Sequence, residues 1–200
     1  MSETVIIEGP REPFAAGIEV PGDKSLSHRA VILSAMATGT STVERAATGR
    51  DVHSTLEIAQ QLGVEVDGSR LTSPGIDGWK EPHGPLDCGN SGTTMRLLAG
   101  AFAGSGKTAT LIGDEFLMRR PMKRLVEPLG ALGAGVTLAE DGTAPVEIAG
   151  VKRPTAADVD IPMASAQVRT AFSLAAVRGD GESTITSPAG FRDHTERWFE

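Results

Sequence analysis

The chain repeats one pattern three times, and this repeat restricts the possible folds more than any other feature of the sequence. Each copy has a basic residue, an apolar helix-like segment, a glycine stop and a threonine-rich strand. The basic residues that open the helices are Arg29, Arg96 and Arg169, which are 67 and 73 positions apart. This period is longer than the units of common solenoids, which have about 20–50 residues. The pattern therefore predicts a βαβαβ-type unit that is used three times.

A second helix follows in the first two copies. It is predicted to end before Gly63 in one copy and before Gly133 in the other, because glycine is the usual residue just past a helix C-terminus. Runs of threonine and β-branched residues predict strands at 42–46, 108–112 and 183–186. The third copy reaches only the start of its second helix, at 193–200. We therefore expect a fragment or one piece of a split protein.

Charge and composition exclude several classes of function. The chain has 19 basic and 26 acidic residues, a net charge of −7, which argues against general binding to nucleic acids or membrane surfaces. No apolar run approaches the roughly 18 residues of a membrane span, and no secretory signal is recognisable, so a cytoplasmic protein is expected. Cys88 is the only cysteine and is interpreted as a small buried hydrophobic residue. The four histidines show no paired spacing, so no metal site is expected.

Small polar residues precede each apolar helix, and a basic residue lies in or near its first turn. Ser25 precedes Arg29 by one helical turn, and Ser91 and Ser165 stand before the other two basic residues. Free N–H groups and the positive end of the helix dipole make such a terminus suited to anions. One serine at a helix start is usually only a cap. Three in matching positions favour an anion-binding function.

Two further features have structural explanations. Residues 100–108 (GAFAGSGKT) resemble a phosphate-binding loop, but residue 101 is alanine and the segment follows a helix rather than a strand. We interpret them as a helix end followed by a turn. Asp51 and Asp193 stand at corresponding points of their copies, where each is expected to cap the following helix.

Five segments in order resemble the 3-phosphoshikimate 1-carboxyvinyltransferase family, also called 5-enolpyruvylshikimate-3-phosphate synthases. They are residues 21–29 (PGDKSLSHR), 87–96 (DCGNSGTTMR), 113–122 (GDEFLMRRPM), 162–168 (PMASAQV) and 192–196 (RDHTE). The resemblance covers nearly the whole chain and implies an α/β (α+β) fold, the inside-out α/β barrel domain of enolpyruvyl transferases. Such a domain is built of βαβαββ repeats with its helices buried inside.

The resemblance also implies a domain division. Residues 1–20 are expected to form strands that pack with a second domain, and 21–200 to form the first domain. Its repeats are expected at 21–86, 87–160 and 161–200, the last one incomplete. The partner that this implies is a missing C-terminal half, in the same polypeptide or as a second chain.

Site residues follow from the same resemblance. Those implied to bind phosphoenolpyruvate are Lys24, Asn90, Gly92, Arg96, Arg120 and Gln167. Those implied to bind shikimate 3-phosphate are Lys24, Ser25, Arg29, Ser165, Ala166, Gln167 and Arg192. Lys24 is the one residue here suited to catalytic proton transfer, since the family's acid–base carboxylates belong to the other half. The family uses no cofactor or metal, and its phosphoenolpyruvate site binds the herbicide glyphosate.

Two alternatives and one departure accompany this interpretation. Ala166 stands where some members have serine, so one hydroxyl contact to phosphate is lost. The related transferase acting on UDP-N-acetylglucosamine shares the fold, but it has asparagine after the lysine, where this chain has Ser25. A non-catalytic anion-binding module is the alternative from another class.

The repeat also makes a prediction about geometry. The equivalent helix starts are expected to bring four cations onto one face; these are Lys24, Arg29, Arg96 and Arg120.

Overall fold

The computed structural model describes residues 4–9, 13, 15–190 and 192–199. Its helices are α1 (Lys24–Met36), α2 (Arg50–Gln61), η1 (Ile76–Gly78), α3 (Gly92–Ala103), α4 (Glu115–Met118), η2 (Lys123–Leu125), α5 (Val126–Ala131), α6 (Ala166–Ala176) and α7 (Glu196–Phe199). Its strands are β1 (Thr38–Thr42), β2 (Glu65–Asp67), β3 (Arg70–Pro74), β4 (Leu86–Asp87), β5 (Thr108–Ile112), β6 (Gly135–Thr137), β7 (Val146–Ala149), β8 (Asp158–Asp160) and β9 (Thr184–Thr186).

The sheets confirm the threefold repeat. The middle copy is complete, because β4, α3, β5, α5, β6 and β7 form a βαβαββ unit with strand order β4-β5-β7-β6. In the first copy, β3 pairs antiparallel with both β1 and β2. In the third copy, β8 and β9 are parallel and flank α6, just as the parallel pair β4 and β5 flanks α3. The expected boundary at 86/87 falls inside β4, and the one at 160/161 follows β8.

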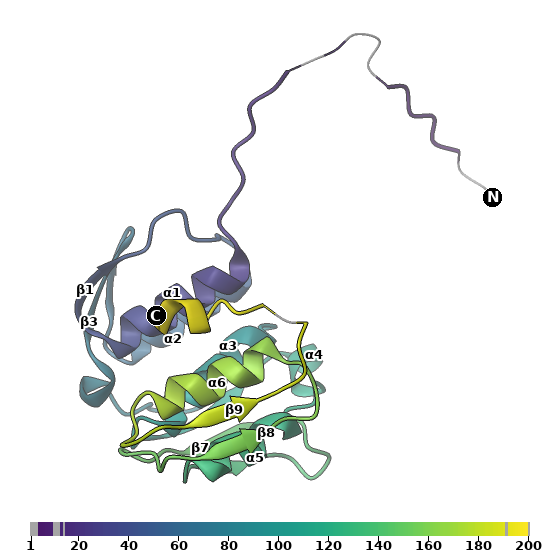
Figure 1. The fold of residues 1–200 in the computed structure, drawn as a ribbon. Helices are drawn as coiled ribbons and strands as arrows, with labels where there is room; N and C mark the ends of the chain where they lie inside the picture. The colour runs from purple at the N-terminus through teal and green to yellow at the C-terminus, as the bar shows by residue number, and fades with distance from the viewer. Residues whose placement is uncertain (1–3, 10–12, 14, 191, 200) are drawn as a thin grey trace.

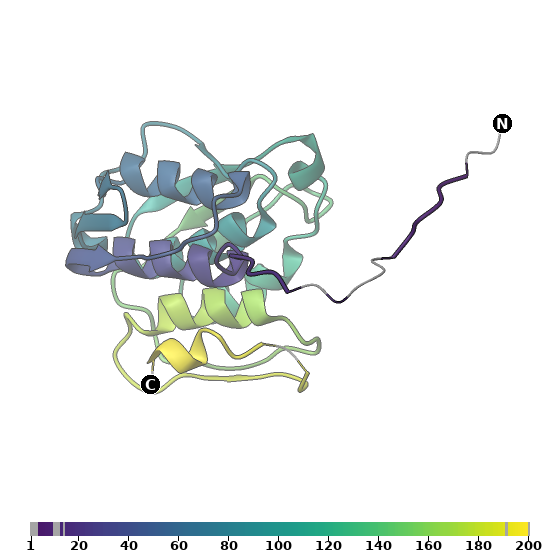
Figure 2. The same ribbon diagram turned by 90° about the horizontal axis from the view of Figure 1, so that it is seen from above.

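The helices lie inside and the sheets outside, as Figures 1 and 2 show. Helix α3 contacts α1, α2 and α6, and also β5 and β7 of its own sheet. Its side chains Met95, Leu97 and Phe102 are fully buried because this helix has protein on every side. An apolar helix is stable only in such surroundings. The predicted inside-out α/β fold is confirmed.

Two glycines of the segment that resembles a phosphate-binding loop let α3 and α6 approach each other. A methyl group built on Gly100 would lie 2.2 Å from the carbonyl oxygen of Ala171, and one on Gly104 would lie 3.0 Å from that of Ala175. Gly104 is also the C-cap of α3, and Gly106 follows with a φ of +74°. The segment is therefore a helix end and a turn, as predicted, and its glycines serve helix packing.

One predicted strand was misplaced. The strand expected at 42–46 is β1 at Thr38–Thr42, because α1 ends at Met36 and the chain extends at once. Arg45 has a φ of +51°, a left-handed conformation that ends an extended segment. Its carbonyl group packs closely on Gly22, where a methyl group would lie 2.0 Å from the oxygen. The strand predicted at 108–112 is β5, and the one predicted at 183–186 is β9, which begins one residue later.

The described parts of the first twenty residues form neither helix nor strand and lie apart from the folded body in Figures 1 and 2. Their large apolar side chains are exposed; these are Val5, Ile6, Ile7, Ile18 and Val20. The expectation that this segment forms strands against a second domain stays a prediction. In the part of the chain that the structure describes, none of the helices is both long and apolar enough to span a bilayer.

Candidate active site

Serine or aspartate caps the starts of α1, α3 and α6. Asp23 accepts a hydrogen bond from the backbone N–H of Leu26 at the start of α1, at 2.8 Å. Ser91 and Ser165 cap α3 and α6 in the same way. The bond from Leu26 lowers the pKa of the Asp23 carboxyl, and the nearby Arg192 lowers it further. Asp23 is therefore an ionised cap, which suits the positive end of the helix dipole.

Two guanidinium groups converge on Gly92, the first residue of α3. A methyl group built on Gly92 would lie 2.6 Å from one terminal nitrogen (Nη1) of Arg96 and 3.4 Å from Nη1 of Arg120. Arg96 donates to the carbonyl oxygens of Gly92 (3.3 Å) and Pro121 (3.2 Å). Burial lowers the pKa of Arg96, and the neighbouring cations Arg120 and Arg124 lower it further. Positive charge thus gathers at a helix N-terminus, where an anion is favoured.

Two side-chain amides orient these arginines. Asn90 accepts a hydrogen bond from Arg120 and donates one to the carboxylate of Asp114 at 2.7 Å. Gln167 of α6 accepts one from Arg96 at 3.0 Å and donates one to the Thr93 hydroxyl at 2.8 Å. The structure therefore joins α3, α6 and the segment around Arg120 in one hydrogen-bonded group. Sequence reasoning missed Thr93 and Asp114, because no spacing links them to their partners.

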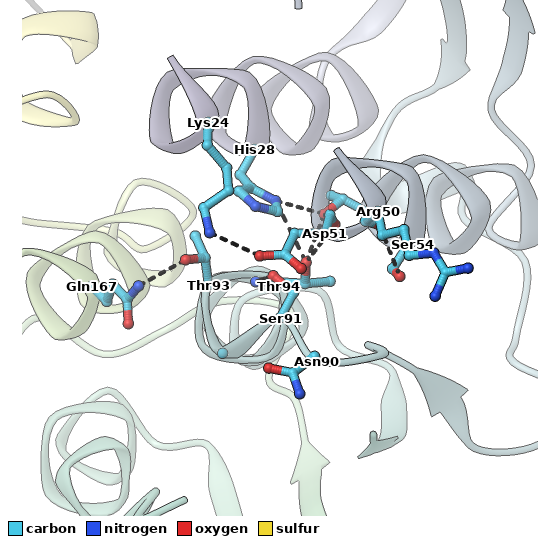
Figure 3. Close-up of polar contacts among 12 residues, drawn as sticks. Lys24, His28, Arg50, Asp51, Ser54, Asn90, Ser91, Thr93, Thr94 and Gln167 are labelled. Carbon is cyan, nitrogen blue, oxygen red and sulfur yellow. Dashed lines mark hydrogen bonds and ion pairs between the residues drawn. The ribbon is translucent and has the colours of Figure 1, made fainter. Parts of the chain in front are cut away.

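Lys24, the first residue of α1, forms an ion pair with Asp51. Its Nζ lies 2.8 Å from Oδ2 of Asp51, and the two side chains are 59% and 28% exposed. The expectation that Asp51 caps α2 is wrong. Gly49 occupies the N-cap position without a side-chain hydrogen bond, and Asp51 lies one residue inside the helix. Its carboxylate turns to the neighbouring helix, as Figure 3 shows.

Arg29 is buried and does not line an open face with the other cations, contrary to expectation. Its guanidinium donates to the carbonyl oxygen and hydroxyl of Ser25, at 3.0 and 2.6 Å. It also donates to Thr170 of α6 and to Thr195, each at 2.7 Å. Burial lowers the pKa of Arg29, while the charges of Glu196 and Asp23 oppose that effect. The α6 helix and the segment before α7 cover this side chain.

The remaining predicted residues lie at the starts of α1 and α6. Ser165 is the N-cap of α6, and its hydroxyl accepts from the N–H of Val168 at 3.3 Å. Ala166 follows as the first residue of the helix. Arg192 is exposed, and its Nη1 is 3.8 Å from Oδ2 of Asp23 at the start of α1. The structure thus places Arg192 beside α1, although the two segments are far apart in sequence.

A buried polar chain lies beneath Lys24 and Asp51 (Figure 3). The His28 Nδ1 and the Thr55 hydroxyl are 2.7 Å apart, and the Thr55 and Thr94 hydroxyls are also 2.7 Å apart. Burial lowers the pKa of His28 to about 4, so this ring is neutral at pH 7. Its Nε2 is buried without a partner among the described residues. The contacts join α1, α2 and α3 just behind the cationic surface.

These features make a surface suited to small anions. It offers the Lys24 ammonium, two guanidinium groups and free N–H groups at helix starts, which together bind phosphate and carboxylate well. Cys88 lies nearby and is fully buried, as predicted, and this burial raises the pKa of its thiol. Among the described residues, no cluster of histidine, cysteine, aspartate and glutamate could bind a metal ion.

Comparison with known proteins agrees with this geometry. The family model described as EPSP synthase (3-phosphoshikimate 1-carboxyvinyltransferase) matches residues 9–200. The 3-phosphoshikimate 1-carboxyvinyltransferase of Methylococcus capsulatus is 44% identical over 200 residues, covering 98% of this chain and 46% of that protein. The corresponding protein of Acidithiobacillus ferrooxidans is 46% identical over 197 residues, with shares of 96% and 45%.

A solved structure gives the same result. The EPSP synthase of Acinetobacter baumannii has a TM-score of 0.85 and 40% identity, covering 90% of this chain and 42% of that one. The chain spans a little less than half the length of these relatives. The resemblance seen in the motifs is confirmed, in preference to the related UDP-N-acetylglucosamine transferase. The chain belongs to the EPSP synthase (3-phosphoshikimate 1-carboxyvinyltransferase) family.

Proposed function

We propose that this chain forms one wall of the active site of a 3-phosphoshikimate 1-carboxyvinyltransferase. The reaction joins phosphoenolpyruvate to the 5-hydroxyl of shikimate 3-phosphate and releases phosphate. The observation that carries the proposal is the convergence of Arg96 and Arg120 on Gly92 at the start of α3. Both substrates carry a phosphate and a carboxylate, so their mutual repulsion must be overcome by fixed positive charge.

Phosphoenolpyruvate is proposed to bind at the Gly92 surface. The Gly92 N–H and the two guanidinium groups would hold its anionic groups, and Lys24 would approach from α1. Asn90 and Gln167 already bind Arg120 and Arg96, so they hold the arginines in place before a substrate arrives. Such preorganisation favours catalysis, because the donors need not be reoriented when the substrate binds.

Shikimate 3-phosphate is proposed to bind between the starts of α1 and α6. Ser165, the N–H groups of Ala166 and Gln167, and Arg192 would hold its phosphate and ring. Arg29 has five N–H groups, four of which serve Ser25, Thr170 and Thr195. Its role would therefore combine one remaining donor with the orientation of the Ser25 hydroxyl.

In the addition step, C3 of phosphoenolpyruvate takes up a proton while the 5-hydroxyl oxygen bonds to C2 and gives up its own proton. Loss of phosphate from C2 and of a proton from C3 then restores the C2–C3 double bond, now as an enol ether. Lys24 is the proton-transfer group that this chain would supply. The second half of the site would come from a C-terminal domain, in the same polypeptide or as a second chain. This proposal predicts that the 200-residue chain alone binds its substrates but does not turn them over.

The test is to mix the purified chain with the separately expressed C-terminal half of the Methylococcus capsulatus relative and to follow phosphate release. We expect activity from the mixture and none from either part. Arg120→Gln should abolish it, whereas Arg119→Gln should not, because Arg119 is exposed and pairs only with Glu115 among the described residues. Turnover by the chain alone contradicts the division of the site. Anion binding without activity in the mixture, or in a covalent chimera of the two parts, would support the non-catalytic alternative.

A further inference from the structure

Asp51 places a carboxylate where it weakens the binding of an anion. It pairs with Lys24, one of the cations proposed to bind phosphoenolpyruvate, at 2.8 Å. The carboxylate would repel the phosphate and carboxylate of the substrate at close range. It also satisfies one of the three ammonium N–H groups of Lys24 and leaves two. The pair therefore lowers the affinity of this surface for anions. Tighter substrate binding is thus not what Asp51 provides.

A role only in α2 does not account for the geometry. An acidic residue in the first turn of a helix is favourable wherever its side chain points. The Asp51 carboxylate, however, turns across to another helix and binds a residue 27 positions away. Lysine has a flexible four-carbon stem with many rotamers, and a carboxylate 2.8 Å from Nζ favours the few rotamers that keep the ammonium group beside it. The ion pair thus fixes where the ammonium group lies.

The backbone at Asp51 is itself held from two sides. Its carbonyl oxygen is 3.3 Å from the hydroxyl of Thr55 in α2 and 3.3 Å from the hydroxyl of Thr94 in α3. With the proton of His28 on Nδ1, each hydroxyl in this group accepts one hydrogen bond and donates one. His28 Nδ1–H donates to Thr55, Thr55 donates to Thr94, and Thr94 donates to the Asp51 carbonyl. Thr94 lies two residues after Gly92, so the position of Asp51 is tied to the start of α3.

From these contacts we infer that Asp51 is a positioning residue. It holds the Lys24 ammonium at a fixed place relative to Gly92, through a carboxylate whose own turn is hydrogen-bonded to α1 and α3. The inference rests on the proposed function, because it assumes that Lys24 acts on phosphoenolpyruvate. According to this inference, Asp51 raises the rate of turnover although it lowers the affinity for phosphoenolpyruvate.

The first test uses a chimera in which this chain continues into the C-terminal half of the Methylococcus capsulatus relative. We expect Asp51→Ala to lower kcat by about 10- to 100-fold, the loss that follows when a reacting group is misplaced by about 1 Å. The KM for phosphoenolpyruvate should stay the same or fall, because a repelling charge has gone. Asp51→Asn keeps an oxygen acceptor and should have an intermediate kcat. The control Glu57→Gln removes an exposed carboxylate from the same helix and should leave both constants unchanged.

A kcat of Asp51→Ala equal to that of Glu57→Gln would overturn the inference, as would a raised KM at unchanged kcat. An inactive parent chimera would instead reject the proposed function.

The second test measures the positioning role on the 200-residue chain, by NMR of ¹⁵N-labelled lysine ammonium groups. We expect a resolved Lys24 signal in the wild type and an averaged one in Asp51→Ala. Identical Lys24 signals in the two proteins would overturn the inference without any measurement of activity.

Discussion

Gly100 of α3 lies directly against the backbone of Ala171 of α6, where a methyl group would come within 2.2 Å of the Ala171 carbonyl oxygen. Backbone cannot move aside as a flexible side chain can, so the two helices would have to separate. These helices carry Gly92 and Gln167 at their starts. The separation of the two helices therefore sets the distance between the candidate site residues of α3 and those of α6.

We therefore expect Gly100→Ala to destabilise the protein by about 3 kcal/mol, the upper part of the usual range for overpacking a core. Urea denaturation of the purified variant measures this free energy of unfolding. Gly130→Ala is the matched control, because Gly130 lies in α5 and a methyl group there would meet nothing within 4 Å. It should raise stability by about 0.5–1 kcal/mol through helix propensity. Similar losses in both variants would contradict the packing explanation.

Gly92→Ala should leave the fold intact but disturb anion binding. The added methyl group meets the ends of the Arg96 and Arg120 side chains, which can shift, rather than backbone. In the chimeric enzyme we expect the KM for phosphoenolpyruvate to rise and inhibition by glyphosate to weaken by roughly tenfold or more, equivalent to about 1.4 kcal/mol. Inhibition titrations compare the two proteins, with Gly84→Ala as the control because its methyl group would be in open space. Equal inhibition constants for Gly92→Ala and wild type would refute the prediction.

Asn90→Ala should weaken the binding of phosphate-containing ligands to the isolated chain. The substitution removes the acceptor of the Arg120 hydrogen bond and breaks the link to Asp114. The guanidinium then loses a fixed orientation, and we expect an affinity loss of about tenfold, near 1.4 kcal/mol. Isothermal titration with phosphoenolpyruvate measures it at constant salt, because ionic strength alone changes such affinities. Unchanged affinity would show that Asn90 does not orient Arg120 for binding.

His28 should make the protein less stable as the pH falls from 6.5 towards 4. Its pKa is about 4 in the folded protein against an ordinary value of 6.5, because burial disfavours the charged ring. The unfolded chain therefore takes up this proton first, and stability decreases through that pH window by up to about 3 kcal/mol. Above pH 6.5 the His28 ring is neutral in both the folded and the unfolded protein, so this loss of stability is absent.

Urea denaturation at a series of pH values measures this effect against His28→Asn, which keeps a group able to bond Thr55. The difference in unfolding free energy between the two proteins should shrink from pH 6.5 to 4. NMR titration of the ring should give a pKa near 4. A His28 pKa close to 6.5 would contradict the burial argument.

The sequence by itself determined the local elements and the family. Apolar helices that end at glycines, such as Gly63 with a φ of +102° and Gly133 with a φ of +94°, were predicted because helix caps depend on neighbouring residues. The threefold repeat predicted three βαβαβ-type units, and the five motifs predicted the family and, through it, the inside-out fold. The strand at 42–46 was misplaced because the chain extends directly after α1 ends at Met36 and then turns at Arg45, whose carbonyl group packs on Gly22.

Only the tertiary structure decided which residues meet. Arg29 and Thr195 are 166 positions apart and share a hydrogen bond, and that contact turns an expected surface cation into a buried one. Lys24 and Asp51 pair because α1 and α2 pack side by side. Residue spacing predicts contacts within a few helical turns, whereas these contacts depend on the distance between packed helices. That distance is set by residues such as Gly100, whose role in packing is visible only when both helices are present.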